Sequence, residues 1–366
     1  MMPPRLTRRL RIGTVAVGGG APVSLQSMTN TDTRDVPATL AQIRRLAAAG
    51  CDLIRVAVPD RTAVAALPAI LAGSPIPVIA DIHFDYRLAL GAIAAGVHAV
   101  RINPGNIGAP ERVRQVAEQA GAAGIPIRVG ANSGSLPPGL LERNLSAGMP
   151  HDEALAEALV ASALQQCRLL EEYGFTAIKV SLKASDVPIT VAACRKFAAR
   201  TDYPLHIGVT EAGTLRRGII KSAAGIGALL LLGIGDTIRV SLTADPEEEV
   251  KAGLILLESL GLRDAAPEIV SCPTCGRTEI DLIGLAQQVE DLIAGIKAAG
   301  KKIGLRKIAV MGCVVNGPGE AKDADLGVAG GKGKLMLFRR GEVIGVYPEA
   351  EGWARFRDAV MSAVEN

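Results

Sequence analysis

Residues 78–103 contain three segments in a row: Val78-Ile-Ala-Asp-Ile82, Leu88-Ala-Leu-Gly-Ala-Ile-Ala-Ala95 and Ala99-Val-Arg-Ile-Asn103. The first and third are short, mainly apolar runs with polar residues toward their C-terminal ends, Asp81 in the first and Arg101 and Asn103 in the third, which is typical of buried strands. The middle segment is rich in Ala and Leu, which favours a helix. A strand, a helix and a second strand in this order predict a parallel β-α-β unit.

The same alternation recurs from residue 23 to about residue 243. The predicted strands are Val23–Ser27, Leu53–Val58, Val78–Ile82, Ala99–Asn103, Ile127–Gly130, Ala177–Ser181, Leu205–Val209 and Thr237–Leu242. The predicted helices include Val36–Ala49, Leu88–Ala95, Pro110–Ala123, Glu153–Tyr173 and Thr214–Leu232. Eight strands with helical crossovers predict an α/β fold of the TIM (β/α)8 barrel type. The alternative, an open doubly wound sheet, usually carries a Gly-rich turn after its first strand, whereas Gly18-Gly-Gly20 precedes that strand here.

A second domain follows the predicted barrel. After a helix at Glu247–Gly261, a polar linker begins at Arg263, so we expect a barrel domain at residues 1–264 and a small α+β domain at residues 265–366. Its predicted elements are the helices Asp281–Ala299 and Glu351–Val364 and the strands Lys307–Val310, Ala324–Ala329, Lys334–Arg339 and Glu342–Tyr347.

Composition excludes several classes of protein. The chain has 366 residues, 49% hydrophobic and 21% charged, which is typical of a globular protein with a large core. The 3% of aromatic residues and the net charge of +3 argue against a nucleic-acid-binding protein. The longest apolar run, at residues 226–234, is too short to span a bilayer, and no secretory signal is recognised at the N-terminus. Six scattered cysteines favour a reducing cytoplasm over a disulfide framework.

Polar side chains stand at the ends of the predicted barrel strands, where TIM barrels build their active sites. The candidates for substrate binding are Arg55, Arg101, Arg128, Asn132, Lys183, His206 and Arg239. A single arginine at a strand end pairs with a carboxylate of the fold about as often as it binds a ligand. Four arginines and a lysine that converge against few carboxylates indicate a site for a phosphorylated small molecule. Glu211, after the seventh strand, is a candidate catalytic group.

Three cysteines lie in the second domain. Cys272 and Cys275 have the C-x-x-C spacing that brings two thiolates to one metal centre, and Cys313 follows an apolar strand and precedes a Gly-Pro-Gly turn. Glu320 lies across that turn, and no histidine occurs after His206. The pattern favours a 4Fe-4S iron–sulfur cluster held by Cys272, Cys275, Cys313 and Glu320. A zinc site with a distant fourth ligand remains the alternative.

Eight segments resemble bacterial 4-hydroxy-3-methylbut-2-enyl diphosphate synthases, the penultimate enzymes of the methylerythritol phosphate route to isoprenoids. They cover nearly the whole chain, at residues 23–33, 54–58, 101–108, 181–186, 208–213, 235–243, 272–278 and 311–320. The resemblance implies a TIM barrel joined to an α+β domain similar to the repeat of sulfite and nitrite reductases, and a 4Fe-4S cluster with three Cys ligands and one Glu. It also implies 2-C-methyl-D-erythritol 2,4-cyclodiphosphate as substrate, flavodoxin or ferredoxin as electron donor, and a homodimer with sites shared between chains.

The chemistry of that reaction suits these residues. A cyclic diphosphate requires converging cations, and removal of an oxygen function from carbon requires single electrons that side chains do not supply. A carboxylate is a weaker iron ligand than a thiolate, which makes Glu320 a candidate catalytic group. Asn316, between Cys313 and Glu320, is a candidate to hydrogen-bond the substrate.

Two other functions are consistent with part of the pattern. A non-catalytic iron–sulfur electron carrier explains the cysteines, but it has no use for a cation-lined barrel. A zinc-dependent barrel enzyme with a zinc-binding appendage explains both halves, and metal analysis separates it from an iron–sulfur enzyme.

Overall fold

The computed structural model describes residues 2–103, 107, 109–264, 267–313, 319 and 321–365. The chain divides into two compact units, Met1–Arg263 and Asp264–Asn366. Each unit has a hydrophobic core of its own. In the described part of the chain, no helix has the length and apolar character needed to cross a bilayer.

The first unit is a parallel barrel, which confirms the predicted fold. Within the described residues its sheet has eight strands, in the order β8-β7-β6-β5-β4-β3-β10-β9. The strands are β3 (Ser24–Met28), β4 (Leu53–Ala57), β5 (Val78–Asp81), β6 (Ala99–Arg101), β7 (Ile127–Asn132), β8 (Ile178–Lys183), β9 (His206–Ile207) and β10 (Thr237–Ile238). A parallel bridge between Val180 and Leu205 joins the two ends of this order and closes the ring.

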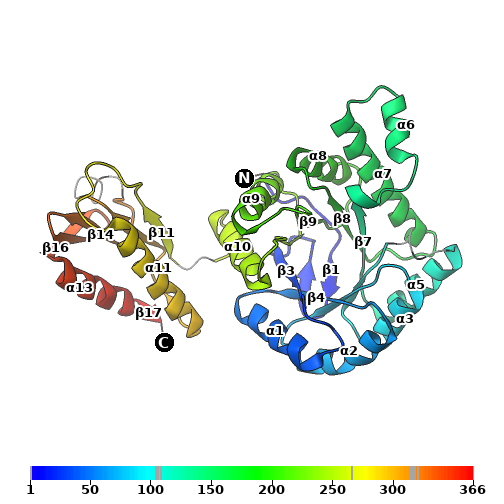
Figure 1. The fold of residues 1–366 in the computed structure, drawn as a ribbon, viewed down its shortest axis with the longest axis horizontal. Coiled ribbons are helices and arrows are strands. Elements are labelled where there is room, and N and C mark those ends of the chain that lie inside the picture. The colour runs from blue at the N-terminus through cyan, green and yellow to red at the C-terminus, as the bar shows by residue number, and fades with distance from the viewer. Residues whose placement is uncertain are drawn as a thin grey trace. The chain divides into compact units, whose positions relative to one another are not determined.

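Helices form the outer layer of the barrel (Figure 1). They are α1 (Val36–Ala48), α2 (Arg61–Gly73), α3 (Tyr86–Ala94), α5 (Pro110–Ala123), α7 (His151–Glu171), α8 (Val187–Ala198), α9 (Leu215–Leu231) and α10 (Pro246–Ser259), with the short α6 (Leu140–Ser146) before α7. Several begin at an aspartate whose carboxylate accepts a backbone N–H of the first turn, as Asp35 does for α1, Asp60 for α2 and Asp186 for α8. These caps fix where each loop ends, and therefore how much chain lies between a strand end and its helix.

Side chains alternate between the two faces of the barrel wall. On β4, Ile54 and Val56 belong to the core between strands and helices, whereas Leu53 packs inside the lower end of the barrel. Strands β9 and β10 have two residues each, which is shorter than predicted. Val209 and Val240 are buried but lie outside these strands. The predicted strands are too long because an apolar run indicates burial and not strand hydrogen bonding.

A hairpin closes the N-terminal end of the barrel. Its strands β1 (Leu10–Ile12) and β2 (Val15–Val17) pair in antiparallel register. The buried side chains of Ile12 and Val17 pack against Leu53, Ile79 and Ala99 near the starts of β4, β5 and β6. The hairpin is not predicted from the sequence, because three-residue strands show no clear periodicity.

The second unit is an α+β domain. In its described part the sheet has five strands, β11 (Glu268–Ser271), β13 (Lys307–Met311), β14 (Leu326–Gly331), β15 (Lys334–Arg339) and β16 (Glu342–Pro348), in the order β11-β13-β14-β15-β16. Pairings are parallel from β11 to β14 and antiparallel from β14 to β16. Helices α11 (Leu282–Ala298) and α13 (Glu349–Met361) share a buried cluster with one face of the sheet. A short pair, β12 (Lys302–Ile303) with β17 (Val364–Glu365), completes the unit.

Candidate functional site

A polar pocket of about 200 Å³ opens at the carboxyl ends of the barrel strands. Its lining residues are Arg55, Asp81, His83, Arg101, Arg128, Asn132, Ser181, Lys183, Thr210, Arg239 and Ser241. The pocket therefore brings together six of the seven residues predicted for substrate binding, which come from β4, β6, β7 and β8 and from the residue after β10. We call it the barrel mouth.

Asp81 organises one side of the barrel mouth. Its carboxylate lies 3.6 Å from Arg55 Nε on β4, 3.3 Å from Arg101 Nη1 on β6 and 3.5 Å from His83 Nε2. Burial by itself would raise the pKa of Asp81, but Arg55, His83 and Arg101 together hold that pKa below its usual range. Asp81 is thus ionised and fixes two guanidinium groups at neighbouring strand ends.

A second buried carboxylate supports the opposite side. Glu249 on α10 lies 3.5 Å from Arg239 Nη2, and it accepts the Leu242 N–H at 2.9 Å and the Ser27 hydroxyl at 3.3 Å. Glu249 is not predicted from the sequence, because it comes from a helix rather than a strand end. Its helical phase was the available signal, since it stands beside Val250 on the buried face of α10.

The barrel mouth has more cations than these two carboxylates neutralise. Arg128 and Lys183 are buried and have no ion pair with a described carboxylate, and Arg128 Nε has no hydrogen-bond partner there. Burial lowers the pKa of both side chains well below its usual value, and neighbouring guanidinium groups lower it further. Buried cations without partners are unfavourable unless an anion binds them, so the barrel mouth is built for an anionic ligand.

Gly208 leaves room at this site. A Cβ atom on this residue would clash with the backbone oxygen of Arg239 and lie 3.0 Å from Lys183 Nζ. A larger side chain would therefore displace Lys183 or the strand end that carries Arg239.

His206 and Glu211 lie outside the lining of the pocket. His206 is fully buried in the barrel interior, where its Nδ1 is 2.8 Å from Thr237 Oγ1. Burial, followed by the charge of Lys183, lowers the pKa of His206 well below its usual value, so the imidazole is neutral. Glu211 is exposed in the loop after β9 and has a positive φ of 51°, a conformation that non-glycine residues adopt uncommonly. The catalytic role of Glu211 stays a prediction.

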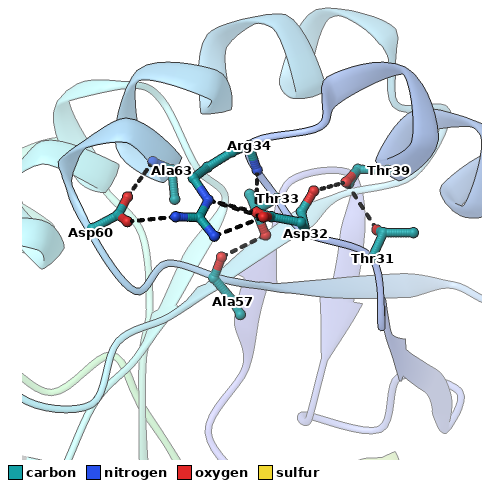
Figure 2. A network of polar contacts seen from close by, with 8 residues as sticks. All are labelled: Thr31, Asp32, Thr33, Arg34, Thr39, Ala57, Asp60 and Ala63. Carbon is teal, nitrogen blue, oxygen red and sulfur yellow. Dashed lines mark hydrogen bonds and ion pairs between the residues drawn. The ribbon is translucent and has the colours of Figure 1, made fainter.

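A polar network ties the loop after β3 to the end of β4 (Figure 2). The Arg34 guanidinium lies 2.7 Å from Asp32 and 3.2 Å from Asp60, the N-cap of α2. The Thr33 hydroxyl donates to the Ala57 carbonyl at 2.6 Å. The Arg34 guanidinium lowers the pKa of Asp32 to about 2, so Asp32 stays ionised and paired with Arg34 at physiological pH. This network fixes the strand end that carries Arg55.

The cysteine motif lies at the ends of two neighbouring parallel strands. Cys272 follows β11 and Cys313 follows β13, and the Gly312 N–H donates to Cys272 Sγ at 3.2 Å. Cys275 is exposed, and the backbone N–H of Arg277 lowers the pKa of its thiol. An N–H donor on one sulfur and a lowered thiol pKa on another favour the thiolate form that iron and zinc bind. These residues fit the thiolate ligands of a metal cluster.

Asn316 and Glu320 lie outside the described residues. Within the described ranges, no three His, Cys, Asp or Glu side chains are gathered as a metal site. Cys51, Cys167 and Cys194 are core residues: all three are buried, and burial raises their thiol pKa to about 12.

Comparison with known proteins gives matches over both units. Residues 7–254 match the family model described as the GcpE TIM-barrel domain, and residues 268–362 match the GcpE protein C-terminal domain. The chain is 55% identical over 359 residues to a protein of Geobacter sulfurreducens, with 98% of this chain and 97% of that protein covered. It is 52% identical to a protein of Dehalococcoides mccartyi, with 96% and 97% covered. Both relatives are named 4-hydroxy-3-methylbut-2-en-1-yl diphosphate synthase (flavodoxin).

Proposed function

This chain belongs to the GcpE family, and on that premise we propose that it is an iron–sulfur oxidoreductase of isoprenoid biosynthesis. The proposed reaction opens the ring of 2-C-methyl-D-erythritol 2,4-cyclodiphosphate and dehydrates it to 4-hydroxy-3-methylbut-2-enyl diphosphate. The observation that carries the proposal is the barrel mouth, where Arg55, Arg101, Arg128, Lys183 and Arg239 converge and only Asp81 of the described lining residues is acidic. Such a site favours a compact ligand with several negative charges.

The guanidinium groups bind and orient the diphosphate. Asp81 holds Arg55 and Arg101 in place, so their remaining N–H donors point from fixed positions and lose little entropy when the ligand enters. Arg128 and Lys183, which lack a described carboxylate partner, gain an anionic partner in the phosphate oxygens of the ligand. Asn132 and Ser181 add neutral donors and acceptors for the ester and hydroxyl oxygens of the substrate.

Cys272, Cys275, Cys313 and Glu320 would hold a 4Fe-4S cluster. When bound, that cluster supplies electrons one at a time at low potential. The Gly312 N–H at Cys272 stabilises the negative charge on this sulfur, and such hydrogen bonds raise the reduction potential of a cluster. In this proposal Glu211 and Asn316 are the groups that hydrogen-bond the reacting oxygen of the substrate.

Flavodoxin is the proposed electron donor, as in the names of the relatives, with ferredoxin as the alternative. We also propose a cytoplasmic homodimer in which the cluster unit of one chain serves the barrel mouth of its partner. The few residues between α10, which ends at Ser259, and β11, which begins at Glu268, support this arrangement, since they limit how far the cluster unit can reach toward the mouth of its own barrel.

The decisive experiment is anaerobic purification followed by iron, sulfide and zinc analysis, a visible spectrum and a turnover assay. The assay supplies the cyclodiphosphate with reduced flavodoxin or reduced ferredoxin. We expect about four irons per chain, by the composition of a 4Fe-4S cluster, and formation of 4-hydroxy-3-methylbut-2-enyl diphosphate. Stoichiometric zinc without iron would indicate the zinc-dependent barrel enzyme instead. A full cluster without turnover would indicate an electron carrier.

A further inference from the structure

Lys179 is a buried lysine to which the proposed reaction assigns no role. It lies on β8, in register with Arg128 on β7 and two residues before Ser181 of the barrel mouth. The side chain is 1% exposed, and its Nζ has no hydrogen-bond partner within the described part of the chain. It does not line the pocket, so it lies in the barrel interior beneath the mouth.

Around Lys179, basic side chains outnumber carboxylates. In the described part of the chain, the charged and titratable groups of the barrel interior, the mouth and the immediate wall include Arg55, Asp81, His83, Arg101, Arg128, Lys183, Cys194, His206, Asp236, Arg239 and Glu249. Asp236 faces Lys179, but its two oxygens accept the Thr7 hydroxyl at 2.8 Å and the Leu205 N–H at 2.7 Å. Asp81 and Glu249 pair with arginines. No described carboxylate therefore forms an ion pair with Lys179.

An excess of buried positive charge changes the protonation of amines and imidazoles, but not that of guanidinium groups. An arginine keeps its proton in proteins, whereas a buried lysine or histidine loses it. Burial lowers the pKa of Lys179, Lys183 and His206 well below their usual values, and the charge of Arg128 lowers each of them further. His206 Nε2, like Lys179 Nζ, has no hydrogen-bond partner in the described residues. The barrel thus holds three groups, Lys179, Lys183 and His206, that can take up a proton when an anion binds.

We propose that the barrel takes up protons from solvent when a diphosphate ligand binds, and that Lys179 is the deepest group to accept one. The ligand brings negative charge to the strand ends. This charge favours the protonated forms of Lys179 and His206, which lie beneath it. Lys179 is then a positioning residue, since its charge acts on the ligand through Arg128 and Lys183. The inference rests on the proposed function for the class of ligand, a cyclic diphosphate.

The sign of the pH dependence follows from this coupling. A ligand that favours the protonated barrel binds more tightly at lower pH, where the protons are already present, and less tightly as pH rises. For each proton taken up, the dissociation constant rises by up to about tenfold per pH unit. A site that used arginines alone would bind the same ligand with little dependence on pH between 7 and 9.

Calorimetry of the full-length holoprotein tests the proposal without any mutation. The oxidised protein is titrated with 2-C-methyl-D-erythritol 2,4-cyclodiphosphate at pH 8 in HEPES and in Tris, which have different ionisation enthalpies. Each phosphorus of this ligand carries one strongly acidic hydroxyl, so the ligand neither gains nor loses protons at this pH. We expect a binding enthalpy that depends on the buffer with the sign of proton uptake. Saturable binding with the same enthalpy in both buffers would overturn the inference and leave the proposed function intact, whereas an absence of binding would refute both.

Two variants then assign the proton. Lys179→Met should reduce the buffer dependence, and Lys179→Arg should reduce it while keeping the affinity closer to that of the wild type, because arginine is charged before the ligand arrives. The matched control is Lys251→Met, which removes an exposed lysine that pairs with Glu248 on α10. It should leave the buffer dependence unchanged. An unchanged buffer dependence in both Lys179 variants would exclude Lys179 as the acceptor.

Discussion

The Asp81 carboxylate lies 3.3 Å from the Arg101 guanidinium across the neighbouring strands β5 and β6, and the two side chains are 5% and 8% exposed. A buried pair of this kind stabilises the fold modestly when complete and costs much more when one partner is removed. Here the pair also joins two strand ends of the barrel mouth, so its integrity affects stability and ligand binding together.

Asp81→Asn should therefore destabilise the empty protein by about 3 kcal/mol at pH 7, the cost of leaving buried cations without their partner. The pKa of Asp81 is lower in the folded chain than its unfolded value of about 3.9. The contribution of the carboxylate is thus fully present above pH 4 and is lost as pH falls toward the folded pKa. Urea unfolding at pH 7 and at pH 3 should show a difference between variant and wild type that shrinks in acid. The exposed Asp152→Asn is the matched control, and an equal effect of both substitutions would contradict this role of Asp81.

Single replacement of Arg55, Arg101, Arg128 or Lys183 by Ala should raise the Michaelis constant for the cyclodiphosphate. Each lost charge-assisted contact is worth roughly 1.5–3 kcal/mol, or about tenfold to more than a hundredfold. Iron content should stay at the wild-type level. Arg114→Ala, which removes an exposed arginine on α5, should change neither quantity. Unchanged Michaelis constants in all four mouth variants would place the diphosphate elsewhere.

Lys179→Met should raise the melting temperature of the ligand-free protein at pH 7. It replaces a buried amine without a described partner by an apolar side chain of similar length, and an unsatisfied buried group costs about 1–3 kcal/mol. Because the pKa of Lys179 is depressed in the fold, the wild type gains stability as pH rises toward the unfolded value of about 10.4. The advantage of the variant should therefore shrink between pH 7 and pH 10. A lower melting temperature at pH 7 would show that Lys179 stabilises the empty barrel.

Cys272→Ser, Cys275→Ser and Cys313→Ser should each abolish cluster binding, because serine is a poor iron ligand at neutral pH. Iron and sulfide analysis and the visible spectrum of anaerobically purified protein measure the loss. Cys51→Ala, Cys167→Ala and Cys194→Ala are the controls, since these thiols are buried in the barrel core. A full cluster in any one of the first three variants would remove that residue from the ligand set.

Mixing two inactive variants, Glu211→Gln and Cys313→Ser, tests whether chains share sites. If the cluster unit of one chain serves the barrel of its partner, mixed dimers should regain up to about one intact site of two, by the symmetry of a two-fold pair. Activity is assayed after subunit exchange has been demonstrated with differently tagged chains. Exchange without recovery of activity would indicate that each chain completes its own site.

Much of the barrel can be predicted from sequence because its signals are local. Helix α5 is predicted to the residue, since Pro110 lies at its start and Gly124 ends it in a left-handed conformation with φ of 65°. The cations of the barrel mouth can be recognised from the sequence, because the strands of a parallel barrel all end at the same face. Arg55, Arg101 and Arg128 therefore meet once the barrel has formed.

The rest of the site depends on contacts that no local pattern reports. Glu249 pairs with Arg239 from a helix, and β11, which ends just before Cys272, is a four-residue strand whose partner β13 lies far along the chain. Whether a strand-end side chain reaches the pocket also depends on strand length. His206 is buried beneath the mouth, because it is the first residue of β9 and lies in register with Thr237, the first residue of β10.

The hairpin of β1 and β2 closes the described part of the barrel at the end opposite the mouth. Ile12 and Val17 fill that end, so substrate and product both pass through the mouth, in opposite directions. The linear diphosphate must depart before the next cyclic molecule enters, and the two compete for one set of cations. Product inhibition should accordingly be competitive toward the cyclodiphosphate, and no saturating concentration of electron donor should relieve it.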